Sequence, residues 1–392
     1  MKFKQIQRNG LFSWSPNRHE TSVAIGTTSQ QFDANFSNDS KLEIFDLNVE
    51  ECNEDVRLKA SKVVNNAFNC IQWHPNAVIG GTQVKTLQFF DVTADDIELR
   101  HETEAQTSGL SCIALNTKEL QLLAIGCADG SVGVWDIDGK GKSERSLNLT
   151  ISGINDSINA VKWNRQVSSI LAAASNSNVH VWDTRKPVNS GPIVRVQDNN
   201  AASLWGSGQQ SLMISRSLVW SESNATTLII ANSNDSNPIL QLWDLRYATC
   251  PLNYFKGGHS RGIQSISWNK YDEQLLLSAG KDNAVCLWDP SAAVNEESLQ
   301  AIIPYITNQW INEIEWCEWE PSLFAVNSFD GNTTIYNITQ TNSLNQTNTK
   351  ILESFDLSSQ NVRPDQMQTS AQRQPILTRA PKWLRIPCRP SF

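Results

Sequence analysis

An aromatic residue followed by an acid or an amide recurs seven times along the chain at a nearly constant spacing. The successive steps are 45, 45, 47, 61, 45 and 48 residues. Repeats of this length are typical of units that fold as small antiparallel sheets rather than as helical pairs. The chain is therefore expected to be a repeat protein, and the recurring pairs are Phe45-Asp46, Phe90-Asp91, Trp135-Asp136, Trp182-Asp183, Trp243-Asp244, Trp288-Asp289 and Tyr336-Asn337.

A second series of large residues precedes the first, and each of its members ends an apolar stretch. Leu115 stands in this series where the other units carry Trp, so the third unit is expected to be degenerate at one anchor and intact at the other. Most of the tryptophan is thereby assigned to the scaffold. The series consists of Trp14, Trp73, Leu115, Trp163, Trp220, Trp268 and Trp316.

Between the two anchors of a unit lies a β-rich run followed by a tight turn. The turn is Asp129-Gly130 in the third unit, Asp282-Asn283 in the sixth and Asp330-Gly331 in the seventh. These residue types tolerate the positive φ angles of two-residue hairpin turns, and the flanking Val, Leu and Ile residues fit half-buried strands. The pattern predicts a β-hairpin in each unit.

These features resemble the WD-repeat family, whose units fold as four-stranded blades around a central channel. The resemblance implies an all-β, seven-bladed propeller over residues 1–337, with the aromatic-acid pair ending the third strand of each blade. It also implies a buried structural hydrogen-bond network in the sixth unit, formed by His259, Ser278, Asp282 and Trp288. A catalytic role for His259 is the alternative.

The first residues of the chain are expected to close the ring. Apolar residues alternate around Phe3 and Ile6, ahead of the inner strand of the first unit. Residues 2–7 can therefore serve as the outer strand of the last blade and remove an exposed sheet edge. Pairing of this segment with residues 333–336 is the test of that expectation.

Three segments interrupt or follow the repeats. Insertions at residues 27–40 and 198–211 are rich in polar residues and are expected to be surface loops. Residues 338–378 contain mainly Thr, Asn, Gln and Ser and carry no blade pattern. Such a composition predicts a largely disordered linker.

Composition argues against several classes of protein. The net charge is −8 and the pI about 5.3, with no stripe of Lys and Arg, which disfavours nucleic acid or an anionic membrane as the main ligand. No apolar stretch approaches the ~20 residues of a membrane span, and the first thirty residues lack a secretory apolar core. The chain is expected to be soluble and intracellular.

Catalytic and metal-binding patterns are also missing from the sequence. The eight cysteines include no CxxC pair, and the five histidines are scattered, which disfavours a metal site. Gly206-Ser207-Gly208 lacks the five-residue frame of a nucleophile elbow, and no phosphate-binding loop of the Gly-x-x-x-x-Gly-Lys type occurs. We expect neither an enzyme nor a cofactor.

Longer stretches resemble one WD-repeat subfamily, the large outer-coat subunit of the COPII vesicle coat. The resemblance spans nearly the whole chain and includes its end. The stretches are residues 32–37, 40–45, 163–167, 170–175, 241–246, 259–263, 328–331, 380–383 and 389–392.

This resemblance implies a structural scaffold rather than a catalyst. In the subfamily, the propellers meet as vertices of a cage that curves the endoplasmic reticulum membrane, and a following segment donates strands to a smaller, six-bladed propeller subunit. Residues 379–392, including Pro381, Trp383 and Phe392, would begin that insertion segment. The expected partners are the smaller propeller, bound through sequence beyond residue 392, further copies of the chain, and inner-coat subunits bound through regions absent from this sequence.

The resemblance also implies a cytoplasmic protein held peripherally at endoplasmic reticulum exit sites and on vesicles, and a chain that is the first part of a larger protein. Two other functions stay open. Arg185 and Arg246 fit a Trp-Asp-x-Arg pattern that resembles substrate receptors of cullin-based ubiquitin ligases, although either Arg can also be a plain surface residue. A small-molecule or modified-peptide pocket in the central channel is the third reading.

Overall fold

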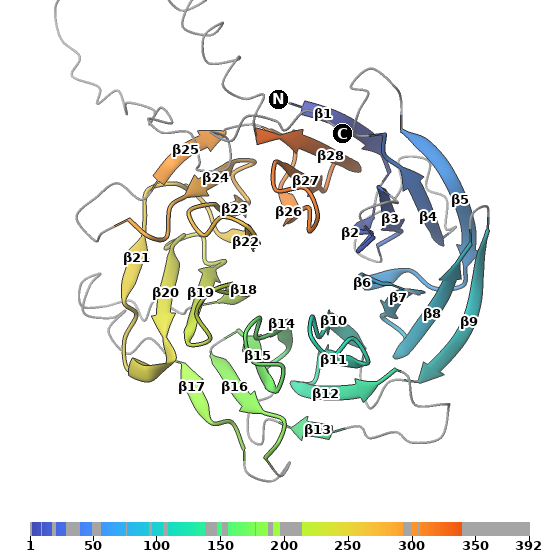
Figure 1. The fold of residues 1–392 in the computed structure, drawn as a ribbon. Helices are drawn as coiled ribbons and strands as arrows, with labels where there is room; N and C mark the ends of the chain where they lie inside the picture. Colours follow the sequence, from blue (N-terminus) through green and yellow to red (C-terminus); the bar gives the residue numbers. More distant parts are fainter. Residues whose placement is uncertain are drawn as a thin grey trace, which may run out of the picture.

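The computed structural model of the chain is a ring of seven four-stranded antiparallel sheets (Figure 1). The predicted seven-bladed, all-β propeller is therefore confirmed. The structure describes residues 2–8, 10–17, 21–28, 40–48, 56–75, 77–93, 96–104, 109–137, 147–150, 156–176, 178–186, 191–196, 214–292, 299–303 and 306–338.

Each blade runs from the centre of the ring to its rim through four strands. The innermost strands are β2 (Leu11–Trp14), β6 (Phe68–His74), β10 (Leu110–Leu115), β14 (Ile158–Trp163), β18 (Ser215–Trp220), β22 (Ile263–Trp268) and β26 (Ile311–Trp316). The second strands are β3 (Ser22–Gly26), β7 (Ala77–Thr82), β11 (Leu122–Cys127), β15 (Ile170–Ser175), β19 (Thr227–Asn232), β23 (Leu276–Gly280) and β27 (Leu323–Ser328).

The third strands are β4 (Ser40–Asp46), β8 (Thr86–Val92), β12 (Ser131–Asp136), β16 (Val179–Asp183), β20 (Leu240–Asp244), β24 (Val285–Trp288) and β28 (Asn332–Asn337). The outer strands are β5 (Arg57–Val64), β9 (Ile97–Glu104), β13 (Leu147–Thr150), β17 (Val194–Val196), β21 (Asn253–Phe255), β25 (Leu299–Ile303) and β1 (Lys2–Gln7). A short 3-10 turn, η2 (Leu245–Tyr247), follows β20.

The two anchors of each blade lie in register on either side of one apolar residue. In the fifth blade, Leu228 on β19 lies opposite Trp220 on one neighbouring strand and opposite Trp243 on the other. All three side chains are fully buried. The same row recurs in the other six blades. The recurring spacing of the sequence is thus the spacing of one apolar row across each blade.

The hairpin turns join the second and third strands and use positive φ angles as predicted. The φ angle is 85° at Gly130, 60° at Asn283 and 80° at Gly331. In the second blade Lys85 takes this conformation, with a φ of 71°. That turn carries no Asp-Gly or Asp-Asn pair, so the sequence signal for it was weaker.

The ring closes through the first residues of the chain. β1 pairs antiparallel with β28, with Gln5 opposite Thr334 and Ile6 opposite Thr333, and it forms the outer strand of the seventh blade. Ile6 is buried in a cluster that also contains Phe12 of the first blade. The two ends of the propeller are therefore built into one sheet (Figure 1).

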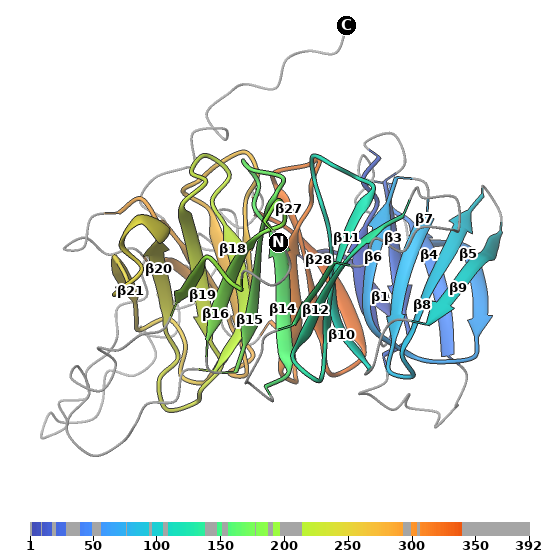
Figure 2. The same cartoon turned by 90° about the horizontal axis from the view of Figure 1, so that it is seen from below.

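The strands run between two faces of the ring, seen from its edge in Figure 2. The face that carries the turns between second and third strands is called the hairpin face. The opposite face, which carries the loops between first and second strands, is called the anchor face. Most of the insertion at 27–40, all of 198–211, and the segments 339–378 and 379–392 lie outside the described residues. No helix in the described ranges is long and apolar enough to cross a membrane.

Candidate functional site

The four residues assigned to a network in the sixth unit lie together, and they lead from the hairpin face, where Asp282 stands in the turn, into the buried interior of the blade. His259 Nδ1 lies 3.0 Å from Asp282 Oδ1, and His259 Nε2 lies 2.7 Å from Ser278 Oγ. Trp288 Nε1 donates to the same Ser278 hydroxyl at 2.7 Å. The chain of hydrogen bonds links the loop before β22 to the second and third strands of the blade.

Asp282 is the most heavily used member of this network. It also accepts hydrogen bonds from the backbone N–H groups of Ser260, at 2.8 Å, and Ala284, at 3.4 Å. Burial alone would raise the pKa of Asp282, but the hydrogen bond and charge of His259 and the two backbone donors outweigh burial, so the pKa is lowered. A Cβ at Gly280 would lie only 2.5 Å from Asp282 Oδ1, so the close approach requires glycine.

In three blades, an asparagine directly after the inner anchor connects neighbouring blades on the anchor face. Asn164 Oδ1 accepts hydrogen bonds from the backbone N–H groups of Gln166 and Val167, both at 2.9 Å, and so folds its own loop. Its Nδ2 donates to the carbonyl oxygen of Ala225 in the next blade at 2.7 Å. Asn164 is buried, so one side chain supports two loops.

Two other blades repeat this arrangement. Asn116 Nδ2 donates to the carbonyl oxygen of Ser168 at 2.7 Å, and Asn269 Nδ2 donates to that of Pro321 at 3.0 Å. These asparagines were not among the predicted site residues. The sequence signal was nevertheless present, because a polar residue follows the anchor directly in Leu115-Asn116, Trp163-Asn164 and Trp268-Asn269.

Neighbouring innermost strands are also joined through side chains. Ser13 Oγ on β2 accepts a hydrogen bond from the backbone N–H of Trp73 on β6 at 2.9 Å. Ser267 Oγ on β22 accepts one from Trp316 on β26 at 3.0 Å. An innermost strand has one free edge, so these hydroxyls satisfy N–H groups that no strand partner reaches.

The junction between the last and first blades carries acids instead of hydroxyls. Glu313 on β26 accepts a backbone hydrogen bond from Phe12, and its Oε2 is buried with no hydrogen-bond partner among the described residues. Burial raises the pKa of Glu313 to about 7 and that of Glu315 to about 8, while the charge of Lys162 opposes both shifts. The last blade therefore brings two acids with raised pKa values to the place where the ring closes.

The two Arg residues of the Trp-Asp-x-Arg patterns are folded back onto their own blades. Arg185 donates to both carboxylate oxygens of Asp183, at 2.9 and 2.7 Å, and Arg246 forms the same paired contact with Asp244. These hydrogen bonds lower the pKa of each Asp to about 2. Both Arg side chains remain about 70% exposed, so each stays accessible at the surface.

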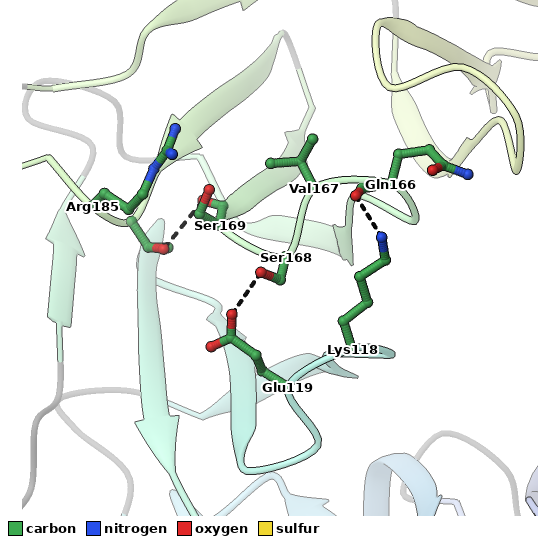
Figure 3. Close-up of a pocket in the computed structure, with 8 residues that line it drawn as sticks. Lys118, Glu119, Gln166, Val167, Ser168, Ser169 and Arg185 are labelled. Carbon is green, nitrogen blue, oxygen red and sulfur yellow. Dashed lines mark hydrogen bonds between the residues drawn. The ribbon is translucent and has the colours of Figure 1, made fainter.

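A pocket of about 420 Å³ lies beside Arg185, between the third and fourth blades (Figure 3). Its polar lining is already used by the fold. Lys118 Nζ donates to the carbonyl oxygen of Gln166 at 2.6 Å, and Ser168 Oγ donates to Glu119 at 2.6 Å. Both bonds join loops of neighbouring blades, so the pocket is a part of the inter-blade contacts rather than a set of free groups directed at a ligand.

The remaining predicted site residues cannot be placed. Pro381, Trp383 and Phe392 lie outside the described residues. Within the ranges that the structure describes, no three His, Cys, Asp or Glu side chains are arranged to hold a metal ion.

Comparison with known proteins gives a consistent result at three levels. The WD domain, G-beta repeat family matches residues 97–136 and 250–289. Protein transport protein Sec31A of Danio rerio is 30% identical over 422 residues, and protein transport protein sec31 of Emericella nidulans is 28% identical over 413 residues. Both alignments cover 100% of this chain but only 32% and 30% of the relatives. The chain thus spans about a third of their length.

Solved structures show the same similarity. A chain from a structure described as the COPII outer coat vertex on membranes matches with a TM-score of 0.75 and 26% identity, over 85% of this chain and 85% of that one. A chain of the mitotic checkpoint complex matches with a TM-score of 0.65 at 13% identity, which reflects the shared propeller fold alone. By fold this chain is a seven-bladed β-propeller with two matches to the WD repeat, and it is similar to the protein transport proteins named Sec31 and to a chain of the COPII outer coat vertex.

Proposed function

We propose that this chain is a structural scaffold and protein-interaction module of the COPII outer coat, where it forms cage vertices during budding from the endoplasmic reticulum to the Golgi. The observation that carries the proposal is the similarity to Sec31 proteins over 100% of the chain, together with the match to the outer coat vertex structure. The inter-blade hydrogen bonds supply the rigidity that such a role requires.

The proposed partners follow from this role. They are the smaller six-bladed propeller subunit, other copies of the chain at vertices, and inner-coat subunits that bind other regions of the protein. Residues 1–337 are proposed as the propeller, 338–378 as a linker, and 379–392, with Pro381, Trp383 and Phe392, as the start of the segment that enters the smaller propeller. The protein would act in the cytoplasm, peripherally on exit sites and vesicles, without catalysis.

Co-purification with the smaller subunit tests this proposal. Two forms are compared, the present chain and the same chain extended by about fifty residues of its natural gene, since a donated blade contains roughly forty-five. Capture by the extended form alone supports strand donation. Failure of both forms removes the main support for the coat role.

The same pull-down separates the ubiquitin-ligase alternative. A propeller adaptor captured by the chain and lost on Arg185→Ala or Arg246→Ala would favour a substrate receptor. Retention of coat subunits by both variants of the extended form, with no adaptor captured, would favour the scaffold.

A further inference from the structure

The rim of the first two blades differs from the rest of the rim. Its outer strands, β5 and β9, have eight residues each, whereas the described parts of the other outer strands have between three and six. β5 and β9 contact each other and form one continuous outer surface (Figures 1 and 2). These two strands are called the β5/β9 rim.

Apolar side chains are exposed on this rim. Leu58 is 44% exposed and Val63 is 63% exposed on β5, and Leu99 is 45% exposed on β9. A single exposed apolar residue needs no explanation, but three on two adjoining strands provide a site that gains free energy when a partner covers it.

The charges of the two strands are opposite in sign. β5 carries the bases Arg57, Lys59 and Lys62 and no acid. β9 carries three acids, one Arg and one His, and its acids are Glu98, Glu102 and Glu104. Among the ion pairs between described residues, none joins β5 to β9. The rim thus presents a basic strand beside an acidic strand.

The free edges of both strands are protected against further strand pairing. The register shifts in β5 at Lys59, between the pairs Ile44↔Ala60 and Phe45↔Leu58. It shifts in β9 at Arg100 in the same way. A bulge with a charged residue discourages addition of another strand. A partner on this surface therefore binds through side chains.

We propose that the β5/β9 rim is a twofold contact between two copies of this chain. When the twofold axis runs parallel to the strands and passes between them, β5 of each copy faces β9 of the other. The contact is then self-complementary, with basic facing acidic on both sides of the axis. The biological meaning of this contact rests on the proposed coat role, in which copies of the chain meet at vertices.

A charge-swap experiment tests the proposal. One variant reverses the basic strand (Lys59→Glu with Lys62→Glu), and the other reverses the acidic strand (Glu98→Lys with Glu104→Lys). Sedimentation equilibrium at low ionic strength, at concentrations into the millimolar range, measures association of the wild type, of each variant and of their equal mixture. Thermal denaturation establishes that each variant is folded.

Each variant alone should self-associate about tenfold or more weakly than the wild type, because like charges then face each other. In the mixture, the reversed β5 of one variant faces the reversed β9 of the other, and the native β9 of the first faces the native β5 of the second, so opposite charges meet at both contacts and association should return. Reversing two lysines on other blades, Lys256→Glu with Lys270→Glu, should leave self-association unchanged. High salt should weaken the wild-type contact.

The proposal is overturned if the wild type does not associate, if both variants associate like the wild type, or if the folded variants fail to associate when mixed. Such a failure does not touch the coat role, since co-purification with the smaller subunit is measured separately. The proposal would also be overturned if either rim variant lost the ability to capture the smaller subunit, because the rim would then bind a different partner.

Discussion

Asp282 shows how one side chain can hold a blade together. It contacts the His259 ring and two backbone N–H groups at a single turn. We predict that Asp282→Ala lowers the free energy of unfolding by ~1–3 kcal/mol, because it leaves buried donors without an acceptor. Urea denaturation measures this effect.

Asp129→Ala is the matched control for that substitution. Asp129 occupies the hairpin turn of the third blade, and its exposed side chain accepts hydrogen bonds from the backbone N–H and the hydroxyl of Ser131. Asp129→Ala should lower the free energy of unfolding clearly less than Asp282→Ala does. An unchanged denaturation midpoint for Asp282→Ala would remove the case for a stabilising network.

Glu313 and Glu315 give the propeller a defined pH dependence. Their folded-state pKa values are about 7 and about 8, both above the value of 4.5 expected for an unfolded chain. The folded state therefore binds protons more tightly than the unfolded state. Their contribution to stability is fully present below pH 4.5 and is lost as the pH rises through 7 to 8.

The variants Glu313→Gln and Glu315→Gln should therefore raise the Tm at pH 8 and flatten its decline between pH 5 and 8. Differential scanning calorimetry across this range provides the measurement. Glu119→Gln on the anchor face is the comparison, since its carboxylate is engaged by Ser168 away from ring closure. Parallel Tm profiles for the wild type and both ring-closure variants would contradict the assignment.

At the scale of the element, the anchor rows were predictable and the contacts between blades were not. Trp220 and Trp243 stand out because large apolar residues recur at a fixed interval, and they share one neighbour, Leu228. Asn164 bonds to Ala225, sixty-one positions along the chain. Only the fold brings those two residues together, so the sequence offered a polar residue after the anchor but not its partner.

The hairpin turns also divide into those that the sequence predicts and those that it does not. The residue types of Asp282-Asn283 predict a hairpin turn. Lys85 also adopts a positive φ angle, although its position in the turn has no Gly, Asn or Asp that would predict one. The tertiary structure overrides local preference there.

The inter-blade asparagines lead to a prediction for the blade as an element. Asn164→Ala should lower the free energy of unfolding by about 1–3 kcal/mol, because two loop N–H groups and the Ala225 carbonyl lose their partner. Asn269→Ala should behave alike, since it repeats the contact in the sixth blade. Chemical denaturation of both variants, beside the exposed Asn224→Ala, measures the difference. Equal stability of all three would contradict it.

For the molecule as a whole, the pairing of β1 with β28 determines whether the ring is closed. Deleting residues 1–7 would remove the outer strand of the seventh blade and the buried Ile6 side chain. We predict a lower Tm and a tendency to aggregate through the freed edge of β28. A synthetic peptide of residues 1–8 added in trans should restore the Tm by rejoining the sheet.

Thermal denaturation measures the effect of the deletion on the Tm, and light scattering measures aggregation. A scrambled peptide of the same composition is the control, because it keeps charge and length but not the alternation around Ile6. An unchanged Tm after deletion would mean that closure contributes little. Rescue by the scrambled peptide would mean that the effect does not depend on strand register.

Coat assembly on membranes tests whether the proposed scaffold role in the COPII outer coat is correct. The full protein that contains this chain is compared with a form that lacks residues 1–337, each with the remaining coat subunits on liposomes, by electron tomography. We expect the shortened form to be recruited but to form no vertices or closed cages. Cages of normal geometry without residues 1–337 would contradict it.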